Sequence, residues 1–211
     1  MTINENAIEA HDLALERLPN PHRCPWLVQY LLISPLRRLS EPPDKLVGPY
    51  VQRGMTVLDP GCGFGYISLP LARMVGPEGR ILSVDIEPRA VQRLLRRASN
   101  AGLADRIETR VCQPRDLQLA EYIGEVDLVT VIHTLHEFED LPGFLAQVSA
   151  LLKPSGKMLV VEPPGHVKPE HFRAEINCCR RNGFQELQPS PQAKGNMTSL
   201  LAPKSHPVRQ S

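Results

Sequence analysis

The sequence has no run of apolar residues long enough to cross a membrane as a helix, which needs about 18 to 20 of them. The apolar stretch at 26–39, WLVQYLLISPLRRL, is interrupted by Pro35 and by arginines. The first twenty residues are acidic and have no apolar centre, so they do not have the pattern of a secretory signal peptide. These absences predict a cytoplasmic protein.

The sequence also lacks any CxxC pair among its cysteines. Their number is odd and they are scattered along the chain, which argues against a disulfide framework and against a structural zinc site. We therefore expect reduced thiols and no metal. The adjacent pair is expected on a helix with one thiol buried and the other exposed, because neighbouring positions there point about 100° apart. The five cysteines are Cys24, Cys62, Cys112, Cys178 and Cys179.

There is almost no excess of charge of either sign. The 24 basic and 23 acidic residues leave a net charge of +1, so the chain as a whole is not attracted to phosphate backbones. Four arginines nevertheless lie at roughly helical spacing, and the favoured interpretation is a solvated helix face. The alternative is a local contact with RNA or protein. These arginines are Arg89, Arg93, Arg96 and Arg97.

What the sequence does contain is a regular alternation of predicted strands and helices. Strands are expected at 55–59, 80–86, 106–111, 125–133 and 157–163, and helices at 67–75, 90–103, 141–152 and 169–182. Such alternation is typical of an α/β, Rossmann-like, doubly wound and mostly parallel sheet. The stretches 184–190 and 197–205 are expected to add an antiparallel edge hairpin, giving seven strands. We expect an N-terminal helical extension over 1–44, one α/β domain over 45–205 and a tail over 206–211.

The most informative segment is VLDPGCGFGY at 57–66, where a predicted strand enters a glycine-rich turn before a helix. Glycines at 61, 63 and 65 allow a sharp turn and a close approach of a ligand to the backbone. Asp85 ends the second predicted strand, a position that binds ribose hydroxyls in doubly wound sheets. The spacing GxGxG, followed by Tyr66, differs from the GxGxxG of nicotinamide enzymes. Asp59 just before the glycines would repel a pyrophosphate and suits a cationic ligand such as a sulfonium.

The segments DPGCGFG, SVDIEP, EVDLVTVIHTLHEF and LLKPSGKMLVVEP resemble successive motifs of the class I S-adenosylmethionine-dependent methyltransferases, in particular the UbiE-like small methyltransferase domains. The resemblance covers roughly residues 45–163. It implies that S-adenosylmethionine is the cofactor, that the 59–65 loop, Cys62 included, holds its methionine part, and that Asp85 and Ile86 contact ribose and adenine. The family often has an acid after the third strand; here Gln113 and Pro114 occupy that position, and the Gln113 amide could accept the adenine hydrogen bond.

The acceptor side is expected where the fourth strand ends. His133 would lie beside the methyl donor and orient the acceptor or take its proton, since the ordinary pKa of histidine, about 6.5, suits a general base. The alternative is that only its backbone contacts the cofactor. His136 is expected at the start of a helix, where it packs or lies near the substrate. Trp26 and Tyr30 are expected either to belong to a lid over the site or to pack the N-terminal extension against the domain.

The predicted function is transfer of a methyl group to a small-molecule acceptor by in-line displacement. Three alternatives stay open from the residues alone: an RNA or protein methyltransferase, a noncatalytic S-adenosylmethionine-binding protein, and a nicotinamide enzyme. No membrane partner is expected, and nucleic acid is disfavoured by the balanced charge.

Overall fold

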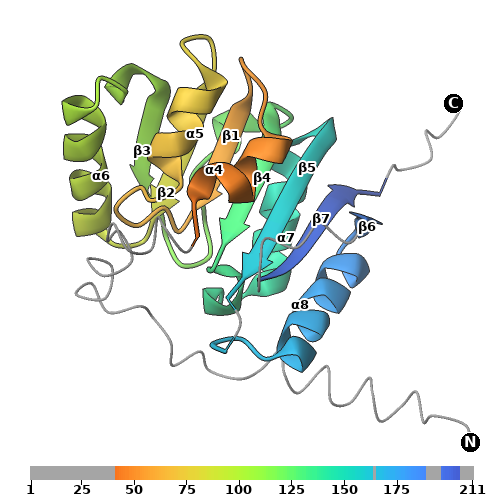
Figure 1. Ribbon diagram of the computed structural model, residues 1–211. Coiled ribbons are helices and arrows are strands. Elements are labelled where there is room, and N and C mark those ends of the chain that lie inside the picture. The colour runs from red at the N-terminus through yellow and green to blue at the C-terminus, as the bar shows by residue number, and fades with distance from the viewer. Residues whose placement is uncertain (1–40, 164, 189–195, 205–211) are drawn as a thin grey trace, which may run out of the picture.

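Seven strands form one sheet in the order β3-β2-β1-β4-β5-β7-β6 in the computed structural model, which describes residues 41–163, 165–188 and 196–204 (Figure 1). Strands β1 to β5 pair in parallel, whereas β7 runs antiparallel to both β5 and β6. The predicted doubly wound sheet with an antiparallel edge hairpin is thereby confirmed. The strands are β1 (Thr56–Pro60), β2 (Arg80–Asp85), β3 (Ile107–Val111), β4 (Val126–Ile132), β5 (Leu152–Glu162), β6 (Phe184–Gln188) and β7 (Met197–Pro203).

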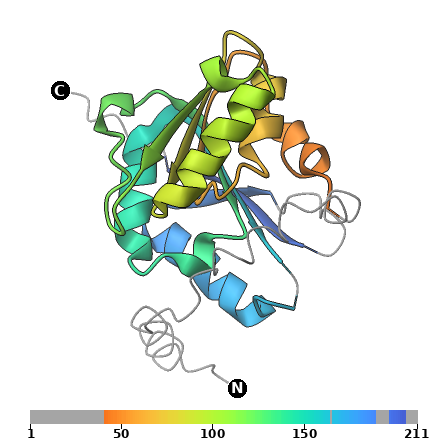
Figure 2. The ribbon, with the colours of Figure 1, turned by 90° about the vertical axis from the view of Figure 1, so that its left-hand side faces the viewer.

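Helices cover both faces of this sheet (Figures 1 and 2). Side chains alternate between faces along a strand, so Val57 packs in one apolar core and its neighbour Leu58 in the other. One core contains residues of α4 (Pro43–Val47), α5 (Ser68–Val75) and α6 (Pro88–Asn100). The other contains residues of α7 (Leu141–Leu151) and α8 (Pro169–Arg181).

Strand β5 begins at Leu152, five residues before the predicted start at 157. Leu152 pairs with Val126, and the register then shifts, so that regular pairing resumes only with Lys157 opposite Leu128. Residues 153–156, between these two pairs, include Pro154 and Gly156 and were predicted to lie outside the strand. They form a bulge that does not interrupt the strand.

The adjacent cysteines of α8 correct another expectation, because Cys178 and Cys179 are both buried, with exposed fractions of 3% and 0%. Helix α8 packs against more than one neighbour, α7 on one side and β6 and β7 on the other. A helix covered from two directions can bury two neighbouring positions.

The parallel pairing places the carboxyl ends of β1, β2, β4 and β5 at one edge of the sheet, where ligands bind in open α/β folds. In the part of the chain that the structure describes, no helix has the length and apolar character needed to span a bilayer.

Candidate functional site

The loop after β1 has the backbone conformation that its glycines predict. Gly61, Gly63 and Gly65 have φ values of +72°, +50° and +80°, in the left-handed region that favours glycine. A Cβ on Gly61 would lie 2.8 Å from Cγ2 of Thr134, and one on Gly65 would overlap Cδ1 of Leu94 in α6. The loop is therefore packed between the end of β4 and α6 and has no room for side chains at these two positions.

Asp85 at the end of β2 joins this loop directly. Its Oδ2 accepts a hydrogen bond from the backbone N–H of Gly63 at 2.8 Å, and its Oδ1 accepts one from Glu87 at 2.9 Å. Only 8% of the residue is exposed, and this burial raises its pKa above the ordinary value. The glycine loop and the acid, 22 positions apart in the sequence, thus lie side by side.

Asp59 faces the protein interior. Its Oδ2 accepts a hydrogen bond from Ser68 Oγ at 2.5 Å and its Oδ1 one from Thr130 at 3.4 Å, while Ser83 donates to Ser68 at 3.1 Å. Burial raises the pKa of Asp59 to about 7 despite these bonds, and the nearby charge of Asp85 contributes to the rise. Asp59 is therefore poised between its neutral and charged forms just before the glycine loop.

Cys62 lies in the same loop but is buried, with 6% exposed. Its backbone N–H donates to the carbonyl of Val84 at 3.0 Å, which ties the loop to β2. Burial raises the pKa of its thiol well above the ordinary value, so the group is a neutral packing element in the structure. Any contact of Cys62 with a ligand would come from its backbone.

Apolar side chains are exposed beside the acid. Ile86 is 41% exposed, and Val111, which pairs with Asp85 in register, is 36% exposed. Next to them Gln113 and Pro114 are also exposed, in a tight turn where Gln113 exchanges backbone hydrogen bonds with Asp116. The surface at the ends of β2 and β3 therefore offers an apolar patch with an amide at its border.

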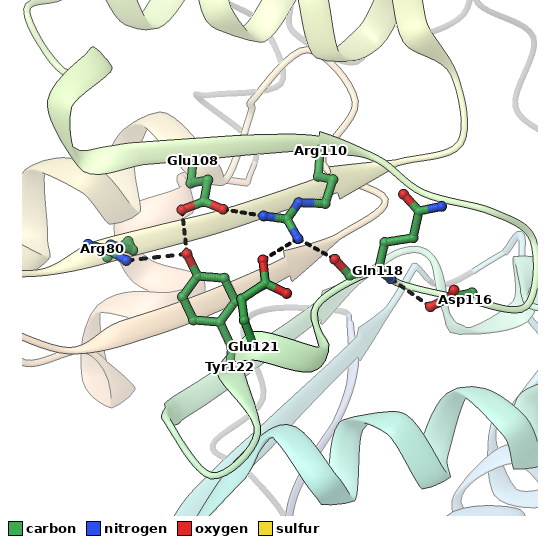
Figure 3. A network of polar contacts seen from close by, with 7 residues as sticks. All are labelled: Arg80, Glu108, Arg110, Asp116, Gln118, Glu121 and Tyr122. Atoms are coloured by element: carbon green, nitrogen blue, oxygen red, sulfur yellow. Dashed lines mark hydrogen bonds and ion pairs between the residues drawn. The ribbon is translucent and has the colours of Figure 1, made fainter.

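A polar network fixes the segment that carries this turn (Figure 3). Arg110 on β3 bonds Glu108 at 2.6 Å, Glu121 at 2.5 Å and the carbonyl of Gln118. Tyr122 donates to Glu108 at 2.5 Å. Residues 118–122 are thereby held against the edge strand, which limits where the Gln113 turn can lie.

His133 directly follows β4 and has a φ of +60°, which is uncommon for a residue with a Cβ. Its backbone N–H donates to Val161 at 2.7 Å, and its Nε2 lies 3.1 Å from Oε1 of Glu41. The same carboxylate accepts from Asn196 at 2.5 Å, and the carbonyl of Glu41 accepts from Tyr66 at 2.5 Å. Glu41 is thus hydrogen-bonded to the loop after β1 and to the residue before β7, and its carboxylate lies next to the imidazole of His133.

A second histidine pairs with a carboxylate that sequence reasoning missed. His136 lies in the short 3-10 helix η4 (Leu135–Glu137), and its Nδ1 is 2.8 Å from Oε2 of Glu162, the last residue of β5. Oε1 of Glu162 accepts the backbone N–H groups of Leu135 at 2.9 Å and His136 at 3.3 Å. Glu162 is fully buried. Glu162 lies at the end of an apolar strand, as Asp59 and Asp85 do, and this pattern could have identified it from the sequence.

Further ionisable groups surround His136. The ring of His166 lies 5.0 Å away in an edge-on arrangement. Glu175 of α8 is 5% exposed and neither carboxylate oxygen has a hydrogen-bond partner; His171 lies 3.6 Å from one of them. Burial raises the pKa of Glu175 to about 8 and that of Glu137 to about 7. Among the described residues no three such side chains are arranged to hold a metal ion.

Two other predicted site residues, Trp26 and Tyr30, fall outside the described residues. Of the four arginines of α6, Arg97 donates to the carbonyl of Phe64 in the glycine loop, and the other three are exposed on the helix.

Comparison with known proteins gives a consistent result. A family model described as a methyltransferase domain matches residues 51–199. The nocamycin O-methyltransferase of Saccharothrix syringae is 32% identical over 110 residues, covering 52% of this chain and 38% of that protein. The ubiquinone biosynthesis O-methyltransferase of Methylocella silvestris is 30% identical over 145 residues, covering 69% and 53%. The chain thus spans about half the length of these relatives or less.

A solved structure shares the fold. A SAM-dependent methyltransferase from Aquifex aeolicus superposes with a TM-score of 0.76 at 21% identity, covering 85% of this chain and 98% of that one.

Proposed function

This chain belongs to the class I S-adenosylmethionine-dependent methyltransferases, and from that membership we propose that it transfers a methyl group from S-adenosylmethionine to a small-molecule acceptor by in-line displacement. When bound, S-adenosylmethionine supplies a methyl group on a cationic sulfur that is already strongly electrophilic. The chain's own task is then to hold the donor, to align an acceptor atom at about 3–3.5 Å and to exclude water.

The observation that carries the proposal is the contact between the glycine loop and Asp85. The remaining lone pairs of the Asp85 carboxylate can accept hydrogen bonds from ribose hydroxyls, while the backbone N–H groups of Gly63 and Glu87 keep the carboxylate in place. Exposed Ile86 offers an apolar surface for adenine, with Gln113 and Pro114 at its border. The donor's methionine part would lie along the 61–65 backbone.

Asp59 contributes to the same proposal through charge. Its carboxylate is occupied by Ser68 and Thr130, so we assign it no direct bond to the donor. A cationic sulfur nearby would favour its ionised form, which burial disfavours in the free protein.

The acceptor would enter at the ends of β4 and β5. We propose that His133, held by Glu41, orients it there. The contacts of Glu41 with Tyr66, Asn196 and His133 fix residue 41 near the ends of the strands where the acceptor would enter. The small-molecule class follows from the relatives' names and from the balanced charge, which favours neither nucleic acid nor an oppositely charged partner. The four cysteines in the described ranges are buried and form no disulfide, which agrees with a reducing, cytoplasmic location.

The alternatives are separated by following the methyl group. The full chain is incubated with methyl-labelled S-adenosylmethionine and, in parallel, with small phenols, amines, thiols and total RNA. We expect label in a small molecule and loss of transfer in Asp85→Asn. Label in RNA would favour the nucleic-acid alternative, and donor binding without transfer to any acceptor would favour a noncatalytic protein.

A further inference from the structure

A pair of ionisable residues lies beside the donor site and has no part in holding the donor. His136 and Glu162 meet at 2.8 Å where β4 and β5 end, and Glu162 accepts three hydrogen bonds from the segment that carries His136. A fully buried carboxylate with three donors is held in one position. The imidazole is therefore fixed by the protein before any acceptor arrives.

The segment around His136 faces the donor site on both sides. Two residues before it, Thr134 packs against Gly61 of the glycine loop. One residue after it, Glu137 is close enough to Asp85 for the charge of Asp85 to raise its pKa. His136 thus lies between the donor site and the end of β5.

The pairing also defines which nitrogen can react. Because Nδ1 lies against the carboxylate, it carries the hydrogen that Glu162 accepts, and a further proton can only be taken up at Nε2. This is the arrangement of an oriented general base, in which a buried carboxylate selects the tautomer and stabilises the imidazolium.

Charges from every packed element act on this imidazole. Burial alone would lower the pKa of His136, but the hydrogen bond and charge of Glu162 on β5, with Glu137 on η4 and Glu175 on α8, raise it above the ordinary value. The ring of His166, in the loop after β5, is a further ionisable neighbour. The balance gives a base suited to neutral pH.

Glu175 is an independent sign that a polar ligand belongs here. Its carboxyl group is buried, and neither oxygen has a hydrogen-bond partner, although Nε2 of His171 lies 3.6 Å from Oε1. The charges of Glu162 and His136 also affect it. A buried carboxyl group without a hydrogen bond is unfavourable, and an acceptor bearing hydroxyl groups would supply one.

Resting on the proposed methyl transfer, we propose that His136 is the general base of the reaction, positioned by Glu162, and that the acceptor is an acidic hydroxyl such as a phenol or an enol. The acceptor oxygen gives its proton to Nε2 of His136 and forms the new bond to the methyl carbon. The carbon–sulfur bond breaks with its electron pair left on sulfur, and the imidazolium returns the proton to water.

The chemistry selects this acceptor class. A thiol, with a pKa near 8.5, supplies enough thiolate without help, whereas a phenol, with a pKa near 10, profits from a base.

The test compares His136→Asn with Glu170→Gln, a substitution of an exposed residue of α8. Asparagine can still donate to Glu162 but cannot take a proton. With catechol and 4-hydroxybenzoate as probes, we expect kcat of His136→Asn to fall about 100-fold or more, while affinity for S-adenosylhomocysteine stays within about 2-fold. Glu170→Gln should match the wild type. Unchanged turnover in His136→Asn would overturn the inference.

Glu162→Gln, with exposed Glu170→Gln as its control, tests positioning. Loss of the carboxylate should lower the pKa of His136, measured by NMR titration of the imidazole. The acid limb of the pH–rate profile should move to lower pH with it. An NMR pKa of 6.5 or less in the wild type, or a limb that does not move, would contradict the assignment.

The two proposals fail in different ways. A wild type that neither binds S-adenosylhomocysteine nor transfers a methyl group would remove the proposed function itself. A wild type that methylates dithiothreitol but none of the hydroxyl probes would remove only the inference about His136.

Discussion

The donor and acceptor halves of the site are built differently. The donor half, comprising the 59–65 loop and Asp85, comes from consecutive elements and is joined by the backbone bond from Gly63. The acceptor half, comprising His136, Glu162 and Glu175, comes from η4, β5 and α8, and the Glu162 side chain joins η4 to β5 through the imidazole of His136 and the backbone N–H groups of Leu135 and His136. Every carboxylate of the donor half is hydrogen-bonded, whereas Glu175 in the acceptor half is not.

This difference separates two tasks. A site made of a rigid backbone loop can hold the same ligand in many proteins, because its geometry depends on few side chains. A site made of side chains from three elements can change with each substitution while the donor half stays intact. We therefore expect variants in the donor half to lose binding and variants in the acceptor half to lose turnover.

The largest effect is expected from Gly65→Ala. Its φ of +80° and the overlap of a Cβ with buried Leu94 should lower the free energy of unfolding by about 2–4 kcal/mol. Affinity for S-adenosylhomocysteine should fall as the loop shifts. Gly102→Ala is the control, because Gly102 has a φ of +65° but nothing within 4 Å of a Cβ. Urea unfolding and calorimetry give both quantities, and equal losses in the two variants would contradict a packed loop.

An effect on stability that depends on pH is expected from Glu175→Gln in the acceptor half. Burial raises the pKa of Glu175 to about 8 in the folded state from 4.5, so ionisation destabilises the wild type as pH rises between these values. The stability of the variant relative to the wild type should increase by about 2–4 kcal/mol from pH 5 to pH 8. Glu170→Gln should show no such trend. Parallel pH profiles of unfolding free energy for wild type and Glu175→Gln would disprove the burial argument.

The smallest effect tests the charge of Asp59. Because its pKa is raised to about 7, its ionised fraction grows between pH 6 and pH 8, and the cationic donor should gain affinity over neutral S-adenosylhomocysteine by about 3- to 5-fold. Taking the ratio of the two affinities removes the contribution of the contacts that both ligands make. In Asp59→Asn this ratio should not depend on pH. A wild-type ratio that is also independent of pH would mean that the charge of Asp59 does not affect binding of the cationic sulfur.

The donor half could be predicted from the sequence because it is local. The glycines need a left-handed backbone, and Asp85 ends a strand that pairs next to β1, so a strand, a turn and a following strand suffice. The antiparallel edge pair of β6 and β7 was likewise visible in the apolar pattern of its two segments.

The acceptor half could not be predicted, because it depends on long-range register. Ile132 pairs with Val161, and this pairing sets where η4 meets Glu162. A shift of one residue would turn Glu162 to the other face of the sheet. The burial of Glu175 depends in turn on how α8 docks, which also buried both cysteines of that helix. Helical periodicity alone does not contain this information.

If the glycine loop and Asp85 form a binding site for the donor nucleoside, calorimetry of the full chain with S-adenosylhomocysteine should detect it, with Asp85→Asn and Asp127→Asn compared. Asp127 also accepts a backbone N–H, that of Thr56 at 2.9 Å, but at the opposite edge of the sheet. We expect one bound ligand per chain and no change in Asp127→Asn. Binding should weaken about 30-fold or more in Asp85→Asn, since the bonds of a charged group contribute about 1.5–3 kcal/mol each. An absence of binding to the wild type, or equal binding to all three proteins, would contradict such a site.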